Sequence, residues 1–226
     1  MTNMFWRWIA ASVMATALFA SPAAHAQGST SWSATANSKG GADVKLDAKQ
    51  IEAVKKISGY FNDLKQMRGV FVQTDPDKKR SRGRFAVLKP GKFRFDYAAP
   101  SRKIMASDGR MLRIKEPDQA NPDVVELDNT PFRLLIKNNV DLLRDALILD
   151  VQESEDLIVL ALQDKSPDAP GRVQLYFVKS PVLELKEWVV RDPQGLDTRV
   201  EVSEINKTEA VDPKIFQWEQ ASPFQQ

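Results

Sequence analysis

The spacing of hydrophobic residues changes once along the chain, from a helical period to a strand period. Between residues 51 and 67 apolar residues recur every three or four positions, and Asp47 ahead of them is a residue type that favours a helix N-terminus. The spacing predicts one amphipathic helix from Asp47 to about Met67, lying with one face on a sheet. From Gly69 onward, alternating apolar residues and turn residues predict short β-strands.

About eleven strands are predicted after this helix. They cover 70–74, 83–88, 92–97, 102–107, 110–115, 123–128, 146–151, 157–163, 172–178, 183–190 and 198–205, with a further short strand at 215–218. Turn residues at 89–92 and at the dipeptide Asp108-Gly109 separate some of them. Because helices do not alternate with the strands, we expect an antiparallel sheet and an α+β fold.

Large apolar residues mark one face of several strands. They are Phe85, Phe93, Phe95, Tyr97, Ile104, Leu112, Leu175, Phe177 and Leu185. An antiparallel sheet of this length must curl or close. In a closed sheet these residues form a packed core, and in a curled half-barrel they line a concave apolar surface. Periodicity alone does not choose between the two.

Two short helical segments, 132–138 and 140–144, interrupt the strands. Thr130 is the expected cap of the first, and Pro131 takes its first helical position. Their apolar residues are too many for solvent-facing helices: Phe132, Leu134, Leu135, Ile136, Leu142 and Leu143. We expect these segments and the N-terminal helix to cover the mouth of a curled sheet, and a lid over an apolar cavity indicates a hydrophobic ligand.

The first 26 residues have the layout of a secretory signal peptide. Arg7 is their only charge, an apolar run of about 13 residues follows, and Ala24-His25-Ala26 fits the small-x-small cleavage pattern. We therefore expect export to the periplasm through a cleavable signal peptide (1–26). A disordered leader rich in Ser and Gly (27–45) and a single domain (46–226) would follow.

Composition narrows the chemistry. The chain has 226 residues, 32 Lys and Arg against 30 Asp and Glu, one His and no Cys. With a net charge of only +2, the protein is not expected to have the strongly basic face of a nucleic-acid binder. Loss of residues 1–26 would remove His25, which excludes Ser-His-Asp and Cys-His catalysis and His or Cys metal sites. We expect no enzyme, cofactor or metal; a hydrolase using only carboxylates is the catalytic alternative.

A cluster of cations stands in one predicted hairpin. It comprises Lys78, Lys79, Arg80, Arg82 and Arg84, with Asp75 and Asp77 beside it. One interpretation is docking to acidic partner loops or anionic lipid heads. The other is a solvated loop, with Arg82 and Arg84 on the outward face of the strand that presents Phe85.

Four local patterns resemble one family. They are Phe71-Val72-Gln73, the stretch 89–97 (KPGKFRFDY), Ser107-Asp108-Gly109 and Asn129-Thr130-Pro131-Phe132. In this order, behind a signal peptide and a long helix, they resemble the periplasmic outer-membrane lipoprotein carriers, the LolA family. The resemblance runs from about residue 51 to residue 224.

The resemblance implies an open antiparallel half β-barrel with a helical lid over an apolar cavity for lipoprotein acyl chains. Family members take triacylated lipoproteins from an inner-membrane ABC exporter and pass them to an outer-membrane receptor. By this resemblance Phe93 points into the cavity, and Lys89 stands where the family has the Arg that latches the lid. We expect a monomeric chaperone. The alternatives are a lipid-sensing half-barrel that regulates a membrane partner and a closed scaffold that binds only protein.

Overall fold

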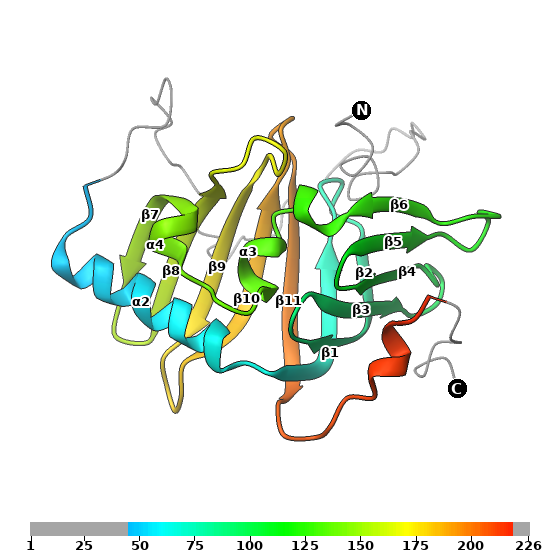
Figure 1. The fold of residues 1–226 in the computed structure, drawn as a ribbon, viewed down its shortest axis with the longest axis horizontal. Helices are drawn as coiled ribbons and strands as arrows, with labels where there is room; N and C mark the ends of the chain where they lie inside the picture. The colour runs from blue at the N-terminus through cyan, green and yellow to red at the C-terminus, as the bar shows by residue number, and fades with distance from the viewer. Residues whose placement is uncertain (1–44, 219–226) are drawn as a thin grey trace, which may run out of the picture.

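The computed structural model describes residues 45–218, which form one curled sheet with helices on its inner side (Figure 1). The strands are β1 Gln66–Thr74, β2 Arg80–Leu88, β3 Lys92–Tyr97, β4 Ile104–Asp108, β5 Met111–Lys115, β6 Asp123–Glu126, β7 Ala146–Glu153, β8 Leu157–Asp164, β9 Arg172–Val178, β10 Glu184–Arg191 and β11 Asp197–Asn206. The helices are α2 Ala48–Asp63, α3 Arg133–Ile136 and α4 Leu142–Asp145, with 3₁₀ helices η1 Leu127–Asn129 and η2 Pro213–Phe216. The predicted signal peptide and all of the leader except Lys45 lie outside the described residues.

The sheet is antiparallel, and its two edges do not meet. The strand order is β6-β5-β4-β3-β2-β1-β11-β10-β9-β8-β7, so β1 and β11 pair in its middle. Figure 1 shows α2, α3 and α4 on one side of this curved sheet, with α2 and α4 over its β7 side. The predicted open, eleven-stranded antiparallel sheet and the α+β class are confirmed. Within residues 45–218 no helix is both long and apolar enough to cross a membrane.

Helix α2 begins where the sequence predicts and ends earlier. The Asp47 carboxylate accepts the Gln50 backbone N–H at 2.8 Å, and the Gln50 side chain accepts the Asp47 N–H at 3.0 Å, which makes a capping box. The predicted end at Met67 is wrong, because the helix stops at Asp63 and Met67 pairs with Val87 in the sheet. Met67 is nevertheless buried, so its apolar character serves the strand and not the helix.

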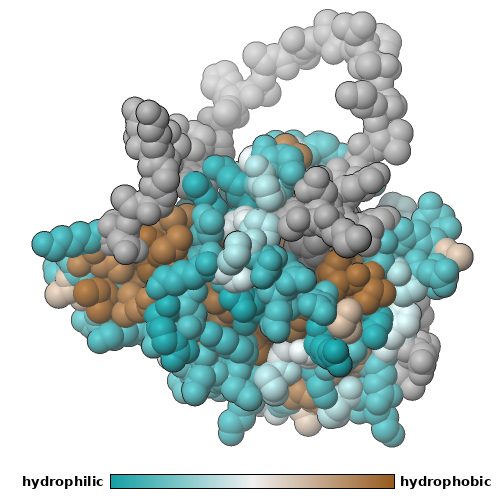
Figure 2. Space-filling view, turned by 45° about the horizontal axis from the view of Figure 1, so that its top comes forward, coloured by the Kyte–Doolittle hydropathy of each residue, from teal (hydrophilic) through white to brown (hydrophobic). Residues whose placement is uncertain are grey.

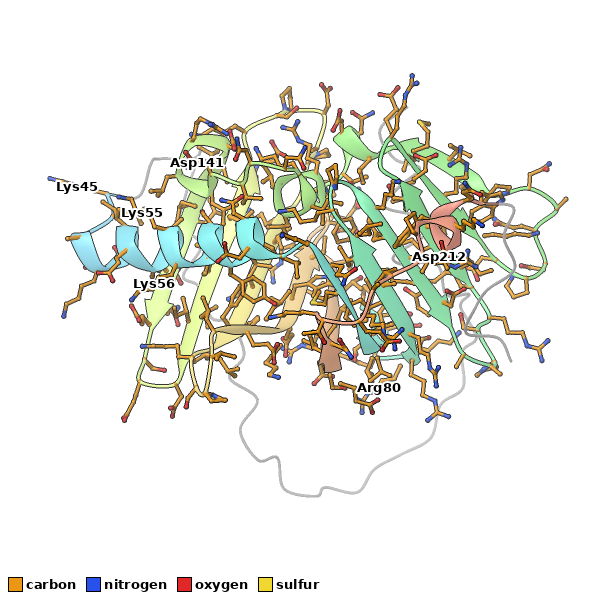
Figure 3. All side chains as sticks on the ribbon, turned by 60° about the horizontal axis from the view of Figure 1, so that its bottom comes forward. Lys45, Lys55, Lys56, Arg80, Asp141 and Asp212 are labelled. Atoms are coloured by element: carbon orange, nitrogen blue, oxygen red, sulfur yellow. The ribbon has the colours of Figure 1, made fainter. Side chains whose placement is uncertain are left out.

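The two short lid helices lie close to their predicted positions, but Thr130 does not cap the first. The Thr130 hydroxyl donates to the Leu127 carbonyl at 2.8 Å and closes η1, and α3 begins without a side-chain cap. In α4, the Asp141 carboxylate accepts the Arg144 backbone N–H at 3.1 Å. Figure 3 shows Asp141 beside α2, on the side of Lys55.

The C-terminal segment covers the outer face of β3. Arg94 and Asp96 point away from the barrel interior, yet both are buried there and joined by two hydrogen bonds of 2.8 and 3.1 Å. Arg94 also donates to the Ile215 carbonyl at 2.9 Å. The predicted strand at 215–218 is wrong: Asp212 (labelled in Figure 3) accepts the Lys214 N–H and starts η2 instead.

Candidate functional site

Two apolar clusters fill the inner side of the sheet. The helix-side cluster joins α2 and α4 to β7, β8, β9 and the start of β10. The aromatic cluster joins β1, β2, β3 and β5 to β10 and β11. Helix α3 lies between them, because Leu134 and Leu135 belong to the helix-side cluster while Phe132 packs against the aromatic cluster and Ile136 against both.

All but one of the predicted cavity residues lie on this inner side. Phe85, Phe93, Phe95, Tyr97 and Leu112 lie in or against the aromatic cluster, and Leu175, Phe177 and Leu185 lie in the helix-side cluster. Ile104 is the exception. It pairs directly with Asp96 on the outer face, while its neighbour Met105 pairs with Phe95 on the inner face. Because directly opposed residues of a strand pair share a face, assigning Ile104 to the cavity is wrong.

The six predicted lid residues pack against the same interior. Leu134, Leu135 and Leu142 are buried, and Phe132, Ile136 and Leu143 are half-buried. The Phe132 ring lies 5.7 Å from the Phe93 ring, centroid to centroid, so a lid aromatic meets a cavity aromatic. We call residues 132–145 the lid from here on.

The lid leaves little free space over the aromatic cluster. The cavity there measures about 30 Å³, and Phe95, Met105, Phe132, Trp188 and Val200 are among the residues that line it. This volume has room for at most a few water molecules and is far too small for an acyl chain. Side chains of the sheet and of the lid therefore fill most of the space over the aromatic cluster.

A wider cleft opens at the surface beside the second half of α2. It measures about 590 Å³ and is lined by Lys56, Tyr60 and Leu183, among others. The face of the molecule drawn in Figure 2 is mostly hydrophilic, with hydrophobic residues gathered in separate patches.

An ion pair joins α3 to the end of strand β8. The Arg133 guanidinium donates to both oxygens of Asp164, at 2.6 and 2.7 Å, and Asp164 is the last residue of β8. The Asp164 side chain is 0% exposed and that of Arg133 is 32% exposed. The hydrogen bond to Asp164 raises the pKa of Arg133 above its ordinary value. Two parallel charge-assisted bonds of this kind are strong and directional.

A second tie joins α3 to the turn between β2 and β3. The backbone N–H of Gly91 donates to the Ile136 carbonyl at 2.8 Å, at the end of α3. Gly91 has φ +70°, as expected for the third residue of its turn, and a Cβ there would lie 2.8 Å from the Cα of Gly109. Glycine is therefore required at this lid contact.

Lys89 does not reach the lid. Its ammonium donates to the Phe61 carbonyl in the last turn of α2, and its backbone N–H donates to the Lys65 carbonyl at 2.9 Å. Burial lowers the pKa of Lys89. The resemblance implied that this position latches the lid, and the structure corrects this: Lys89 holds the end of α2, while Arg133 and Gly91 hold α3.

Helix α2 and the lid are themselves joined. The Asn62 side chain both donates to the carbonyl and accepts from the N–H of Val140, at 2.9 and 2.8 Å. The Ser58 hydroxyl accepts the Leu142 N–H at 3.3 Å. Within the lid, Lys137 and Arg144 both pair with Asp145, and hydrogen bonding to Arg144 is the largest influence that lowers the pKa of Asp145. The lid and α2 thus form one connected cover.

The basic cluster lies away from this cover, on the β1–β2 hairpin. Lys78, Lys79, Arg80, Arg82 and Arg84 are all exposed, and Arg80 comes within 3.6 Å of Glu201 (Arg80 is labelled in Figure 3). Arg82 and Arg84 flank Gly83, which faces Tyr97 on the inner side, so both cations point outward. Docking through this cluster stays a prediction.

Sequence reasoning missed several residues of the site, for two identifiable reasons. Alternation from Leu185 places Glu187 and Val189 on the inner face of β10. A β-bulge between Leu185 and Glu187 shifts the phase, so Trp188 and Val190 face inward instead. Arg133 and Asp164 carried no local pattern, because residues 31 positions apart meet only in the fold.

Comparisons with known proteins agree with this geometry. Residues 62–219 match the family model described as outer membrane lipoprotein carrier protein LolA. The chain belongs to the LolA family. It is 27% identical over 175 residues to an outer-membrane lipoprotein carrier protein of Chromobacterium violaceum, covering 74% of this chain and 83% of the relative. A Nitrosomonas europaea protein of the same description is 28% identical over 180 residues, covering 75% and 85%.

Two solved structures are also similar to this chain. A LolA superfamily protein from Nitrosomonas europaea matches with a TM-score of 0.40 and 14% identity, over 72% of this chain and 96% of that one. MucB matches with a TM-score of 0.44 and 14% identity, over 79% of this chain and 64% of that one.

Proposed function

We propose that this LolA-family protein is a periplasmic chaperone that binds the acyl chains of lipoproteins. The observation that carries the proposal is an apolar interior closed by a helical lid whose own side chains occupy the space that cargo needs. The relatives described as outer-membrane lipoprotein carriers support the same role. Carrying a lipid anchor requires no catalytic step, and no carboxylate is among the described residues that line the interior cavity.

The lid gives such a carrier a means of release. Burial of an acyl chain contributes about 0.8 kcal/mol per CH₂, so a 16-carbon chain would gain roughly 13 kcal/mol before costs. Binding of that strength would trap the cargo. Leu134 and Leu135 must leave the interior when cargo enters, and their return opposes retention. The net affinity is therefore set by the free energy of burying the acyl chain minus the free energy of burying the lid side chains that it displaces.

The route follows from the same proposal. Residues 1–26 direct export, residues 46–226 form one carrier domain, and the monomeric chain accepts triacylated lipoprotein from an inner-membrane ABC exporter. It then delivers the lipoprotein to the outer membrane, to a receptor where one exists. In this proposal the exposed cations at 78–84 bind acidic surfaces of these membrane partners or anionic lipid heads.

Native mass spectrometry of the protein purified from the periplasm tests this function. Bound triacylated lipoprotein or lipopeptide, transferable to a second membrane, would support it. A bound lipid that is never transferred would indicate a lipid-sensing module instead. A protein that is empty and takes up neither a triacylated lipopeptide nor a fatty acid would refute the proposal.

A further inference from the structure

Two of the polar residues that line the small cavity under Phe132 have side chains that make no hydrogen bond to another residue within 45–218. The cavity lies where β1, β3 and β10 end and β4 and β11 begin, and its lining is mainly apolar. Lys103 and Thr198 are among the lining residues, and they are 7% and 4% exposed. Buried polar groups are normally hydrogen-bonded, so the Thr198 hydroxyl in particular requires an explanation.

Lys103 is a largely buried residue whose ammonium still reaches solvent and has no ion pair among residues 45–218. Its ammonium lies 4.3 Å from the centroid of the Tyr97 ring, and it makes no hydrogen bond or salt bridge to a described residue. Burial lowers its pKa, while the charges of Glu116 and Asp75 act in the opposite direction without contacting it. A contact with an aromatic face uses the charge but leaves the N–H donors of the ammonium free.

Thr198 supplies a second free group, and the neighbouring polar groups are already used. The Thr198 hydroxyl is buried and has no hydrogen-bond partner in the part of the chain that the structure describes. By contrast, the Tyr97 hydroxyl donates to Gln73 at 2.6 Å, and the Gln73 amide donates to Asp75 at 2.6 Å. The unmatched groups of the cavity are therefore an ammonium and a hydroxyl, which fit oxygen acceptors.

We propose that Lys103 and Thr198 form a polar subsite for the oxygen atoms at the head of an acyl chain. The shared chemistry is a carboxyl-derived oxygen, either the ester carbonyl of a glyceride-linked chain or the carboxylate of a free fatty acid. The hydrocarbon runs from there along Phe95, Met105 and Trp188, beneath the displaced Phe132. The inference rests on the proposed function, since it needs the interior to accept acyl chains.

The closed cavity is consistent with a site that forms on opening. A volume of about 30 Å³ has no room for an acyl chain, so the ligand must displace Phe132. Met105 is an unbranched, adaptable side chain beside it, and such residues repack readily around ligands. The polar subsite then determines which end of the acyl chain lies deepest in this part of the half-barrel.

The test compares three ligands of equal chain length on the full mature chain. Decanoic acid, methyl decanoate and decane displace a fluorescent apolar probe, 1-N-phenylnaphthylamine, from wild type and from Lys103→Met, Thr198→Val and Lys103→Arg. The control is Lys115→Met, because Lys115 pairs with Ile104 on the outer face. Thermal unfolding of each variant verifies that it is folded.

Lys103→Met should weaken binding of the two oxygen-bearing ligands about tenfold, and Thr198→Val should weaken it about threefold. The affinity of each variant for decane should be unchanged, and Lys103→Arg should bind all three ligands about as tightly as wild type. A loss for methyl decanoate identifies ester oxygens as ligands, and a loss for decanoic acid alone identifies a carboxylate. Equal affinity of Lys103→Met and wild type for both oxygen-bearing ligands overturns the subsite and leaves the carrier function standing. A wild type that binds none of the three ligands removes the proposed function itself.

Discussion

The ion pair between Arg133 and Asp164 offers a direct test of the lid. We predict that Arg133→Met tightens acyl-chain binding and slows release, although it removes a stabilising contact. The substitution keeps a long apolar stem while deleting both hydrogen bonds to Asp164. The closed lid loses this tie, whereas an open lid, in which the two groups are separated and hydrated, is unaffected.

The magnitude follows from the geometry. Each hydrogen bond to a charged group contributes about 1.5–3 kcal/mol, and both bonds, at 2.6 and 2.7 Å, are short. Because the Arg133 side chain is 32% exposed, solvent screening reduces the sum, and about 2 kcal/mol for the pair is a reasonable value. Every 1.4 kcal/mol is tenfold in an equilibrium constant, so the open fraction rises roughly 30-fold.

That change is measurable as affinity. A ligand that binds only the open form has an apparent Kd equal to its intrinsic Kd divided by the open fraction. Titration of the purified protein with a fluorescent triacylated lipopeptide should therefore give a Kd up to about 30-fold lower in Arg133→Met. Hydrogen exchange of the lid amides, residues 132–145, should accelerate by the same factor.

A matched control lies elsewhere in the sheet. Arg191 binds Asp197 with two bonds of 2.6 Å and is 31% exposed, on the outer face of β10 and away from the lid. Arg191→Met should lower overall stability without changing lipid affinity or lid exchange. The reasoning fails if Arg133→Met and Arg191→Met bind lipopeptide equally.

The remaining predictions concern lid packing, the outer face and pH. Leu134→Ala with Leu135→Ala should weaken the closed lid and lengthen lipopeptide retention in a dissociation assay, and unchanged retention would contradict competition between lid and cargo. Arg94→Met should lower the free energy of urea unfolding by about 3–5 kcal/mol by leaving Asp96 buried and unpaired, and joint replacement with Asp96→Leu should recover most of the loss. Burial lowers the pKa of Lys103 in the native protein. Above that lowered pKa the unfolded chain binds more protons than the native chain, so the free energy of unfolding of wild type relative to Lys103→Met should rise with pH toward about 10.4, the ordinary pKa of Lys. Parallel pH profiles of the two proteins would refute this.

The sequence predicted the sheet better than it predicted the contacts that hold the lid. Strand alternation follows from local sterics and burial, so eleven strands and most inner-face residues could be found from the pattern. Ile104 and Trp188 show where this approach fails. A one-residue error in phase or a single bulge exchanges the two faces of a strand. No residue pattern within these strands indicates the exchange.

Buried charges are a second feature that the sequence pattern does not reveal. Arg94 and Asp96 lie on the face opposite Phe93 and Phe95, and an alternating pattern gives no sign that this face is covered. The cover comes from η2, more than 100 residues away, as the bond from Arg94 to the Ile215 carbonyl shows. A long-range partner of this kind turns a polar face into an interior one.

The two kinds of contact at the lid have separate consequences for a carrier. Apolar contacts of Leu134 and Leu135 occupy the same space as cargo, so their strength is tied to the shape of the cavity. The bonds from Arg133 to Asp164 and from Gly91 to Ile136 lie at the ends of α3 and do not depend on what the cavity holds. Changing these polar ties shifts the balance between retention and release without altering the walls that contact the acyl chain. Affinity and chain selectivity can therefore be adjusted by different residues of the same half-barrel.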